Sequence, residues 1–398
     1  MFVVPLLILL GVFAIYPIFC SIVYTLFDYR TNNQATAGLY VSTNFNAPLF
    51  VEDCDYIIYY LEDEAFAADA AGQETIKAIN SDTDAMMKRF SGISEITGLD
   101  GAKADEVKAF ASDIQSRIDS FYASQPADAQ FYHKDNIKLI IDEMRTCIIE
   151  SNFVGLDAYA QLLKDTRFFG SLGNTVWFTF ISVFFELILG MALALIMNKA
   201  IKGIGGVRTA ALIPWAIPTA VSALIWSYMY DGSSGIVAAL FAKLGFIESP
   251  EMMLLSSGGA MTAAILADVW KTTPYMALLL LAGLQVIDHG LYESATIDGC
   301  NAPQTFYYVT LPLLKPSMMV ALVFRTLDAF RVYDLIAVLT GGGPGGTTET
   351  LSIYAYKLMI GQSNYGYGSV VVTAMAICVG LIALVFVKGL GAELISDD

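Results

Sequence analysis

The chain has 398 residues, of which 56% are hydrophobic and 15% are charged, and its formal net charge is −16. Soluble domains carry about a quarter charged residues, so this composition argues against a simple cytosolic enzyme. The charge is also uneven, because residues 31–170 hold 23 acidic and 11 basic side chains. We therefore expect an acidic polar block and an apolar body in one chain. No nucleic-acid partner is expected, because no Lys/Arg cluster is present to bind phosphates.

Six stretches are long and apolar enough to cross a bilayer core of about 30 Å, which needs roughly 20 residues per helix. The predicted spans are residues 2–27, 175–197, 210–229, 261–284, 316–339 and 368–387. The first stretch lacks a basic n-region and is too long for the apolar core of a signal peptide, so it is interpreted as a retained helix. The missing basic start leaves open that the natural chain begins further upstream.

Lys and Arg in short loops predict the orientation, because such loops stay in the cytoplasm. Residues 198–209, between the second and third spans, hold Lys199, Lys202 and Arg208 and no acid. The next loop is mainly acidic, which suits the outside. Alternation then places both termini and residues 285–315 in the cytoplasm and residues 30–174 in the extracellular or periplasmic space.

The external block carries apolar residues at helical spacing around residues 64–80, 105–122 and 136–150, and a short amphipathic helix is expected at 156–163. Its acidic excess is interpreted as a solvated face, with an interaction surface for another extracellular protein as the alternative.

Five cysteines are scattered without a CxxC pair, and only two histidines are present, so no metal site is predicted. Cys54 and Cys147 lie near the two ends of the external block. A disulfide between them would stabilise the block by about 4 kcal/mol in the chain-entropy model. The alternative is two buried free thiols. No Ser/His/Asp or Cys/His set shares a plausible site, so no catalytic centre is expected.

Residues 292–316 predict a compact cytoplasmic protrusion: a short helix, a break at Gly299, a second short helix, and Leu311-Pro312 opening a membrane span. This segment resembles the EAA loop of binding-protein-dependent ABC importer permeases, with serine in place of the first alanine. The resemblance assigns ATPase coupling to these positions: Glu293, Ser294, Ala295, Asp298, Gly299, Leu311 and Pro312.

Three further motifs resemble the carbohydrate branch of this family, at residues 213–218, 270–275 and 339–344. The resemblance covers residues 1–30 and about 150–390. It implies an all-α membrane protein with the type I ABC importer permease fold, six transmembrane helices and an inserted, mainly helical extracellular domain. The implied parts are a first transmembrane helix at 1–29, the insert at 30–155 and the permease core at 156–398. In the maltose-type permease, a large external domain at this position helps to grip the solute-binding protein.

Ionisable residues inside membrane helices are costly and therefore mark functional candidates. Opposite charges recur at i, i+3 spacing in 268/271, 325/328 and 331/334. They are interpreted either as self-neutralising structural pairs or as the wall of a polar cavity. Glu186 is a lone carboxylate in its span, and its role stays open between a helix–helix hydrogen bond and a protonated packing residue.

The resemblance places solute contacts on the fourth and fifth spans, with Arg325 and Asp328 facing solute. Aligned on Pro274 and on Gly342-Gly343-Pro344, the contacts of the maltose-type permease fall on Asp268, Trp270, Lys271, Thr272, Tyr275, Arg325, Asp328, Ala329 and Val332.

The resemblance implies the transmembrane subunit of an ATP-driven sugar importer, most simply for a maltodextrin- or trehalose-like oligosaccharide. The implied partners are a second homologous permease, an ATPase homodimer, an extracellular solute-binding protein and membrane lipid. ATP and Mg²⁺ would be bound by the ATPase subunits and no cofactor by this chain, since the glycine-rich residues 341–346 lack the Lys-Ser/Thr of a phosphate-binding loop. The alternatives are a glycerol-phosphate or polyol permease of the same type, an ion-coupled secondary transporter, and a membrane-anchored receptor.

Overall fold

The computed structural model describes residues 4–126, 129–199 and 203–394. Phe2 and Lys202, which entered the predictions above, lie outside the described residues. The chain divides into two compact units, residues 1–158 with 363–367 and residues 159–362 with 368–398.

The first unit begins with one apolar helix of 21 residues, Val4–Tyr24. It consists of α1 (Val4–Leu10), a π-helical turn (Gly11–Ile15) and α2 (Tyr16–Tyr24). None of its most apolar window is buried against the rest of the protein. Its length suits a bilayer crossing, and its exposed apolar side chains suit lipid.

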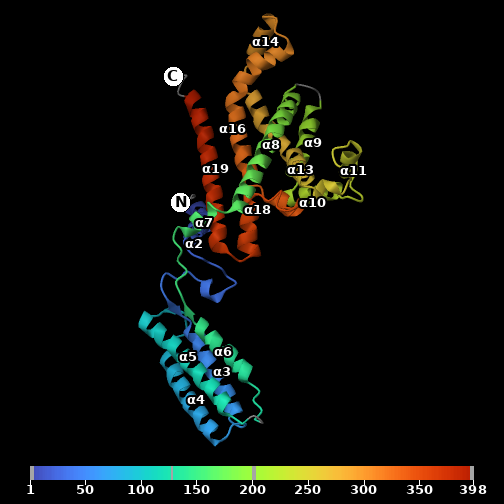
Figure 1. Ribbon diagram of the computed structural model, residues 1–398. Coiled ribbons are helices and arrows are strands. Elements are labelled where there is room, and N and C mark those ends of the chain that lie inside the picture. The colour runs from blue at the N-terminus through green and yellow to red at the C-terminus, as the bar shows by residue number, and fades with distance from the viewer. Residues whose placement is uncertain (1–3, 127–128, 200–202, 395–398) are drawn as a thin grey trace. The chain divides into compact units, whose positions relative to one another are not determined.

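Residues 44–149 form a bundle of four long helices that lie side by side (Figure 1). These helices are α3 (Ala47–Glu64), α4 (Ala70–Phe90), α5 (Gly101–Ser124) and α6 (Lys134–Thr146). A small antiparallel sheet of order β2-β1-β3 ties their ends together. Its strands are β1 (Asn44–Phe45), β2 (Thr97–Gly98) and β3 (Ile148–Ile149), and a 3-10 turn (Gln34–Thr36) precedes them.

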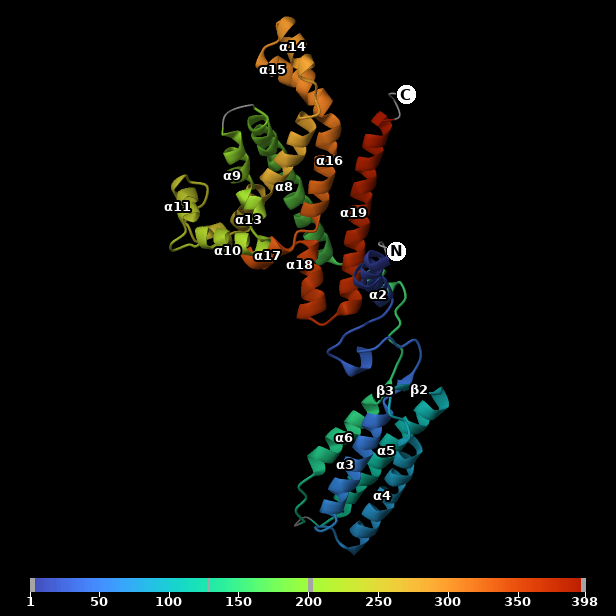
Figure 2. The same cartoon turned by 180° about the vertical axis from the view of Figure 1, so that it is seen from behind.

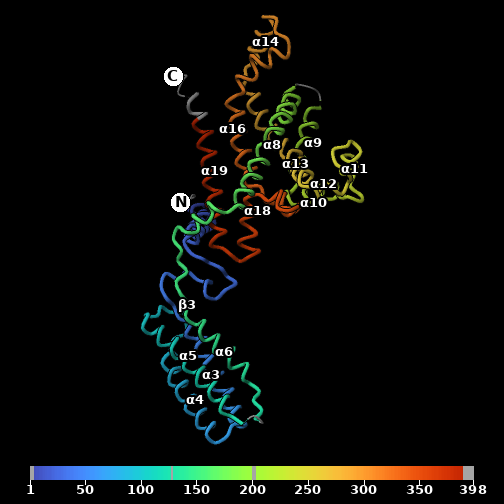
Figure 3. The backbone as a smooth tube through the Cα atoms, in the orientation of Figure 1, coloured from blue at the N-terminus to red at the C-terminus, as the bar shows by residue number. Residues whose placement is uncertain are grey.

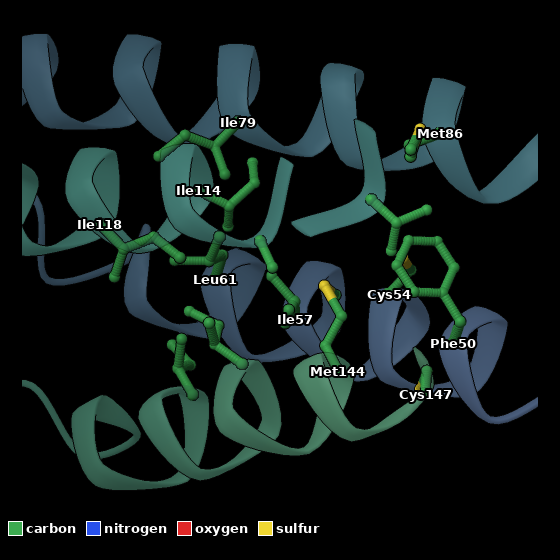
Figure 4. Packing of buried hydrophobic residues seen from close by; sticks show 14 of the residues in the cluster. Phe50, Cys54, Ile57, Leu61, Ile79, Met86, Ile114, Ile118, Met144 and Cys147 are labelled. Carbon is green, nitrogen blue, oxygen red and sulfur yellow. The ribbon is translucent and has the colours of Figure 1, made fainter. Parts of the chain in front are cut away.

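One apolar core holds the bundle together (Figure 4). Helix α3 contributes Phe50, Cys54, Ile57 and Leu61, which recur at the i, i+3/i+4 spacing of a single helical face. Facing side chains of α4, α5 and α6 are fully or almost fully buried against them. Burial of one such apolar side chain contributes about 1.5–3 kcal/mol, so this core is the main source of the bundle's stability.

The predicted helices of this block were partly wrong. The regions 105–122 and 136–146 are helical, within α5 and α6. Helix α3 was not predicted, and the helix predicted over 64–80 instead begins at Ala70. Asp69 causes this late start, because its side chain accepts the backbone N–H of Gly72 and caps α4.

Cys54 and Cys147 are both buried in this core. Of the two alternatives left open by the sequence, the structure has free thiols rather than a disulfide. The Cys147 thiol points to Asp53, with 3.5 Å between Sγ and Oδ2. Burial raises the pKa of the Cys54 thiol to about 12, so this thiol is unreactive while the bundle stays closed.

The described residues of the second unit form helices joined by turns and loops, and no strand lies among them (Figures 1 and 3). Its long helices are α8 (Thr166–Met197), α9 (Ile204–Ala216), α10 (Thr219–Met229), α13 (Ser257–Leu284), α16 (Leu311–Phe330) and α19 (Tyr365–Leu394). Shorter helices join them: α7 (Asp157–Leu162), α11 (Ile236–Lys243), α12 (Met252–Leu255), α14 (His289–Ile297), α15 (Ala302–Thr305), α17 (Asp334–Leu339) and α18 (Leu351–Tyr356). Two π-helical turns, Phe306–Thr310 and Lys357–Gly361, precede α16 and follow α18.

Among the described residues, five helices are long and apolar enough to cross a membrane, and a sixth span results if α9 and α10 count together. The six predicted apolar stretches therefore correspond to helices, but two of them are not continuous. The stretch 210–229 bends by 90° between α9 and α10. Pro218 accounts for this break, because proline disfavours helical backbone at the preceding residue, and Ile217 is extended with ψ 133°. The stretch 316–339 is likewise interrupted after Phe330, before α17.

Helices α8, α13 and α16 pack against one another and form the centre of this unit. Two glycines let them approach closely. A Cβ at Gly190 would lie 2.7 Å from the Met276 side chain, and one at Gly283 would collide with Ser317. Small residues at such contacts are typical of packed membrane helices, and this close packing brings the charged residues of three helices together.

Asp53→Asn is expected to remove a pH dependence from the insert's stability. Burial raises the pKa of Asp53 to about 7, and Glu143 and Glu52 act in the same direction against the Cys147 hydrogen bond. Between about pH 4 and 7, Asp53 keeps its proton in the folded bundle but has lost it in the unfolded chain. The free energy of unfolding therefore falls by about 2 to 4 kcal/mol as the pH rises through this range.

The measurement is the rate at which maleimide labels Cys54 and Cys147 in the full chain, followed peptide by peptide. At each pH this rate is divided by the labelling rate of the same cysteine in the chain unfolded by denaturant. In the wild type this ratio of rates should be higher at pH 7.5 than at pH 5, whereas in Asp53→Asn it should be the same at both pH values. Asp55→Asn, which changes an exposed neighbour, is the control. Equal pH profiles for wild type and Asp53→Asn would contradict the prediction.

Candidate solute cavity and coupling loop

A cavity of about 350 Å³ lies where the breaks in two spans face α13. Polar and ionisable side chains make up most of its wall. The lining residues are Trp215, Thr219, Asp268, Lys271, Thr272, Arg325, Asp328, Ala329, Arg331, Val332, Tyr333, Asp334 and Leu335. The wall therefore comes from three places: the 90° bend between α9 and α10, called the elbow below, the middle of α13, and the end of α16 with the start of α17.

Arg325 is the centre of a buried ion network that joins three helices. Its guanidinium binds Glu186 of α8 through Nε and Nη2, with 2.9 Å between Nη2 and Oε1. Nη2 also donates to Asp268 of α13, and Nη1 donates to Asp328 at 3.0 Å. The Arg325 side chain is only 1% exposed, and Glu186 is fully buried. Since an unpaired charge in such a site is very costly, this network fixes how the three helices pack.

Glu186 is therefore not a lone carboxylate. Of the two roles left open by the sequence, the structure supports contact between helices, because Glu186 pairs with Arg325 and its Oε1 lies 2.7 Å from the Thr272 hydroxyl. The sequence could not show this pairing, since 139 residues separate Glu186 from Arg325.

The predicted i, i+3 pairs are only partly formed. Arg325 and Asp328 do pair, although Arg325 binds Glu186 and Asp268 as well. Among the described contacts, Lys271 forms no ion pair with Asp268. Its ammonium instead lies 3.0 Å from the carbonyl oxygen of Ile217 and 3.5 Å from that of Trp215. Lys271 thus binds carbonyl groups at the α9–α10 elbow, where a helix end leaves carbonyls without intrahelical partners.

Seven of the nine predicted solute contacts line the cavity: Asp268, Lys271, Thr272, Arg325, Asp328, Ala329 and Val332. Trp270 and Tyr275 are not among its described lining residues. The Trp270 ring packs edge-on against Trp226, and the Tyr275 ring stacks on Trp215, both at 5.6 Å between centroids.

Four lining residues were not expected from the sequence: Trp215, Thr219, Tyr333 and Leu335. Arg331 and Asp334 also line the cavity, which is one of the two interpretations given to this charged pair from the sequence. Trp215 and Thr219 flank Pro218, so the break that this proline predicts was the available signal. Tyr333 and Leu335 follow Phe330, at the end of α16, and the sequence contains no comparable signal for that break.

Within the cavity, a few polar groups remain accessible to a solute. Asp328 is 60% exposed, and Arg331, at 3.9 Å from it, is about equally exposed. Arg325 and Asp268 are nearly saturated by the buried network. Asp328 is therefore well placed to accept hydrogen bonds from a solute, whereas Arg325, predicted to face solute, chiefly positions the surrounding carboxylates. Among the described residues, no group of three or more His, Cys, Asp or Glu could hold a metal ion.

The predicted coupling loop has the architecture expected from the sequence. Helix α14 ends in a left-handed turn at Gly299, with φ +82°, and the N–H of Cys300 returns to the carbonyl oxygen of Ala295. Such a turn requires glycine, because a Cβ is strained at this φ. Asn301 and Gln304 then form a reciprocal capping box for α15. The chain continues into the π-helical turn, and α16 begins at Leu311 with Pro312 in its first turn.

This loop protrudes at the N-terminal end of α16 (Figure 2). Its side chains present a mixed apolar and polar surface. Ala295 is buried beneath it, whereas Glu293, Ser294, Asp298 and Gly299 are exposed. Ile297 is 86% exposed, and Tyr307 and Tyr308 are mostly exposed. Such a cluster of exposed apolar groups on a rigid support is typical of a contact surface for another protein.

An apolar helical bundle around an ion-paired polar cavity, with a compact helical protrusion at the end of one span, defines a multi-pass membrane permease. Residues 169–394 match the family model described as "Binding-protein-dependent transport system inner membrane component". Because this match covers more than half of the chain, the protein belongs to that family of ABC importer permeases.

Known proteins agree with this assignment. Over 243 residues the chain is 46% identical to the trehalose/maltose transport system permease protein MalF of Thermococcus litoralis, covering 61% of this chain and 81% of that protein. It is 41% identical to the trehalose transport system permease protein SugA of Mycobacterium tuberculosis, with 61% and 76% covered. A solved chain of a bacterial alginate ABC transporter, in complex with its pentasaccharide-bound periplasmic protein, superposes with a TM-score of 0.53 at 21% identity, covering 72% of this chain and 94% of that one. This structural likeness supports the type I permease fold.

Arg325→Ala is expected to cost about 3–5 kcal/mol of stability, because it leaves Glu186 and Asp268 buried without a counter-charge. The matched control is Arg331→Ala, which removes a largely exposed arginine from the same cavity. The check is the thermal unfolding midpoint of the purified chain in detergent. Equal midpoints for the two variants would contradict the central role assigned to Arg325.

Proposed function

We propose that this chain is one of two transmembrane subunits of an ATP-driven importer for a neutral oligosaccharide of the trehalose or maltose kind. The observation that carries the proposal is the charge-balanced polar cavity in a chain of this family. Three acidic and three basic residues line it, and the most buried of them are paired with one another. Such a wall offers many hydrogen-bond partners and little net charge, which suits a polyhydroxylated neutral solute. The names of the two relatives support the same class of solute.

The cavity supplies half of the pathway, and a second homologous permease supplies the other half. Asp328 and Arg331 are the groups proposed to hydrogen-bond the solute, and the Trp215 ring lies in the same wall. Lys271 holds the elbow in position through the carbonyl oxygens of residues 215 and 217. In this proposal solute binds to a preformed wall, and the movement of helices around it changes the side from which it is accessible.

The coupling loop is proposed to receive the ATPase homodimer. Helix α14, the turn at Gly299 and α15 form one rigid protrusion, and the continuous path from α15 through the π-helical turn into α16 reaches Arg325 and Asp328. A displacement of the protrusion would therefore act directly on the cavity wall. ATP and Mg²⁺ belong to the ATPase in this proposal, and the chain binds no cofactor of its own.

The proposed orientation places the coupling loop and both termini in the cytoplasm and residues 30–174 outside. The parts are a first membrane helix (1–29), an external insert (30–155) and a permease core (156–398). The four-helix bundle of the insert carries most of the acidic excess and is proposed to contact the extracellular solute-binding protein.

The test is reconstitution of the chain with its second permease and ATPase in vesicles, with the solute-binding protein added outside. Trehalose or maltose together with the binding protein should raise ATP hydrolysis several-fold and drive labelled sugar inward. Sugar accumulation that needs an ion gradient and no ATP would instead favour a secondary transporter. Sugar-dependent signalling without transport would favour a receptor.

Gly299→Val is expected to uncouple ATP hydrolysis from transport. Valine at φ +82° strains the turn by about 1–2 kcal/mol or more, so the protrusion would lose its shape while the membrane helices remain intact. Sugar uptake should fall by about tenfold or more at an unchanged amount of inserted protein.

Gly290→Val is the matched control, since Gly290 lies in the same protrusion, is exposed, and is not among the residues with positive φ. The readouts are uptake and ATPase activity in the same vesicles. Normal coupled uptake by Gly299→Val would refute the coupling role.

A further inference from the structure

A second polar pocket, of about 540 Å³, lies between the start of α8 and the loop that precedes α18. Figure 1 shows α18 at the opposite end of the second unit's helices from α14. Its wall contains Arg167, Asn174, Gly346, Glu349 and Lys357. None of these residues lines the solute cavity, so this pocket is separate from the site described above.

Glu349 organises the pocket. Its side chain is 4% exposed, and its carboxylate accepts hydrogen bonds from Nε and Nη2 of Arg167 and from Nζ of Lys357, each at 2.8 Å. Burial alone would raise the pKa of Glu349, but the hydrogen bonds from Arg167 and Lys357 outweigh it and hold the pKa below its ordinary value. The carboxylate is therefore charged, and it holds the two cations in fixed positions.

The two cations in the pocket lining keep N–H donors that no acceptor in the described residues uses. Arg167 is 44% exposed and Lys357 38%. In the described part of the chain, Arg167 Nη1 has no hydrogen-bond acceptor, and Lys357 uses one of its three N–H donors. Asp165 is not among the lining residues; its carboxylate caps α8, accepts the Tyr354 hydroxyl and lies close enough for its charge to act on Arg167. The pocket lining thus carries two cations and one buried carboxylate, and the unused N–H donors of the cations can bind a further anionic group.

The same loop connects the pocket to the solute cavity. Asn174 of α8 donates to the backbone carbonyls of Gly346 and Glu349, which fastens the loop to that helix. The next residue, Thr350, donates its hydroxyl to the carbonyl oxygen of Val332, at 3.3 Å. Val332 lies in the break after α16 and lines the solute cavity. An occupant that competes with Glu349 for Arg167 and Lys357 would therefore act on the cavity wall through adjacent residues.

We propose that the pocket between Arg167 and Lys357 is a docking site for an acidic side chain of the solute-binding protein, an inference that rests on the proposed function. In the proposed orientation the pocket opens to the outside, where that protein approaches. Glu349 already holds these donors at a fixed spacing, so Arg167 and Lys357 lose little conformational freedom when a carboxylate binds. The neutral sugar is not expected here, because this pocket shares no lining residue with the solute cavity.

The test uses the full transporter in vesicles and measures ATPase activity against the concentration of the solute-binding protein, in about 50 and 200 mM salt. Lys357→Gln should raise the half-saturating concentration about tenfold at low salt, leave the maximal rate unchanged, and weaken the salt dependence. Lys357→Arg keeps the charge and should behave like wild type. Lys164→Gln removes an exposed lysine outside the pocket lining and is the matched control.

A half-saturating concentration that is the same for Lys357→Gln and Lys164→Gln would overturn the docking site. So would a loss of maximal rate at unchanged half-saturation, since that result marks a purely structural role. A wild-type transporter whose ATPase does not respond to the binding protein would instead overturn the proposed function, which makes the two failures distinguishable.

Discussion

The buried guanidinium of Arg325 is the interaction on which the architecture of the second unit depends. The Arg325 side chain is only 1% exposed, and it binds buried carboxylates of α8 and α13 together with the exposed Asp328 of its own helix α16. In such surroundings an ion pair adds little net stability compared with apolar packing, but breaking it is very costly. Arg325 therefore chiefly determines how the three helices are positioned, because only arrangements in which every buried carboxylate keeps its partner are stable. The solute cavity forms beside this network and takes its polar wall from it.

Two interruptions in membrane spans complete the cavity. The elbow at Pro218 and the break after Phe330 end helices inside the bundle, and each leaves backbone groups that need partners. Lys271 binds carbonyls at the first interruption, and Thr350 binds a carbonyl at the second. Irregular backbone within a membrane protein is tolerated where it lines a polar cavity. The same features that make the spans discontinuous thus supply the recognition surface, and side chains outside those spans tie them to the rest of the unit.

The external bundle is stabilised in a different way. Its helices carry a heavily charged outer surface around one apolar core, so it needs neither lipid nor the ion network of the membrane helices. Its buried Asp53 and free thiols are local features of that core. Their properties follow from burial among apolar side chains, in the way expected for a water-exposed helical bundle.

The sequence by itself determined the apolar stretches and the coupling loop, because these depend on local composition and on contacts within about 25 residues. The class of protein followed from the resemblance of its motifs to a known family. Gly299 is recognisable as a turn for this reason, since the need for a left-handed φ is a property of one residue. Only the tertiary structure decided the partner of Glu186, the carbonyl contacts of Lys271 and the exclusion of Trp270 and Tyr275 from the cavity. Each of these depends on how helices far apart in the chain are rotated against one another, and that rotation is selected by the packing of the whole bundle.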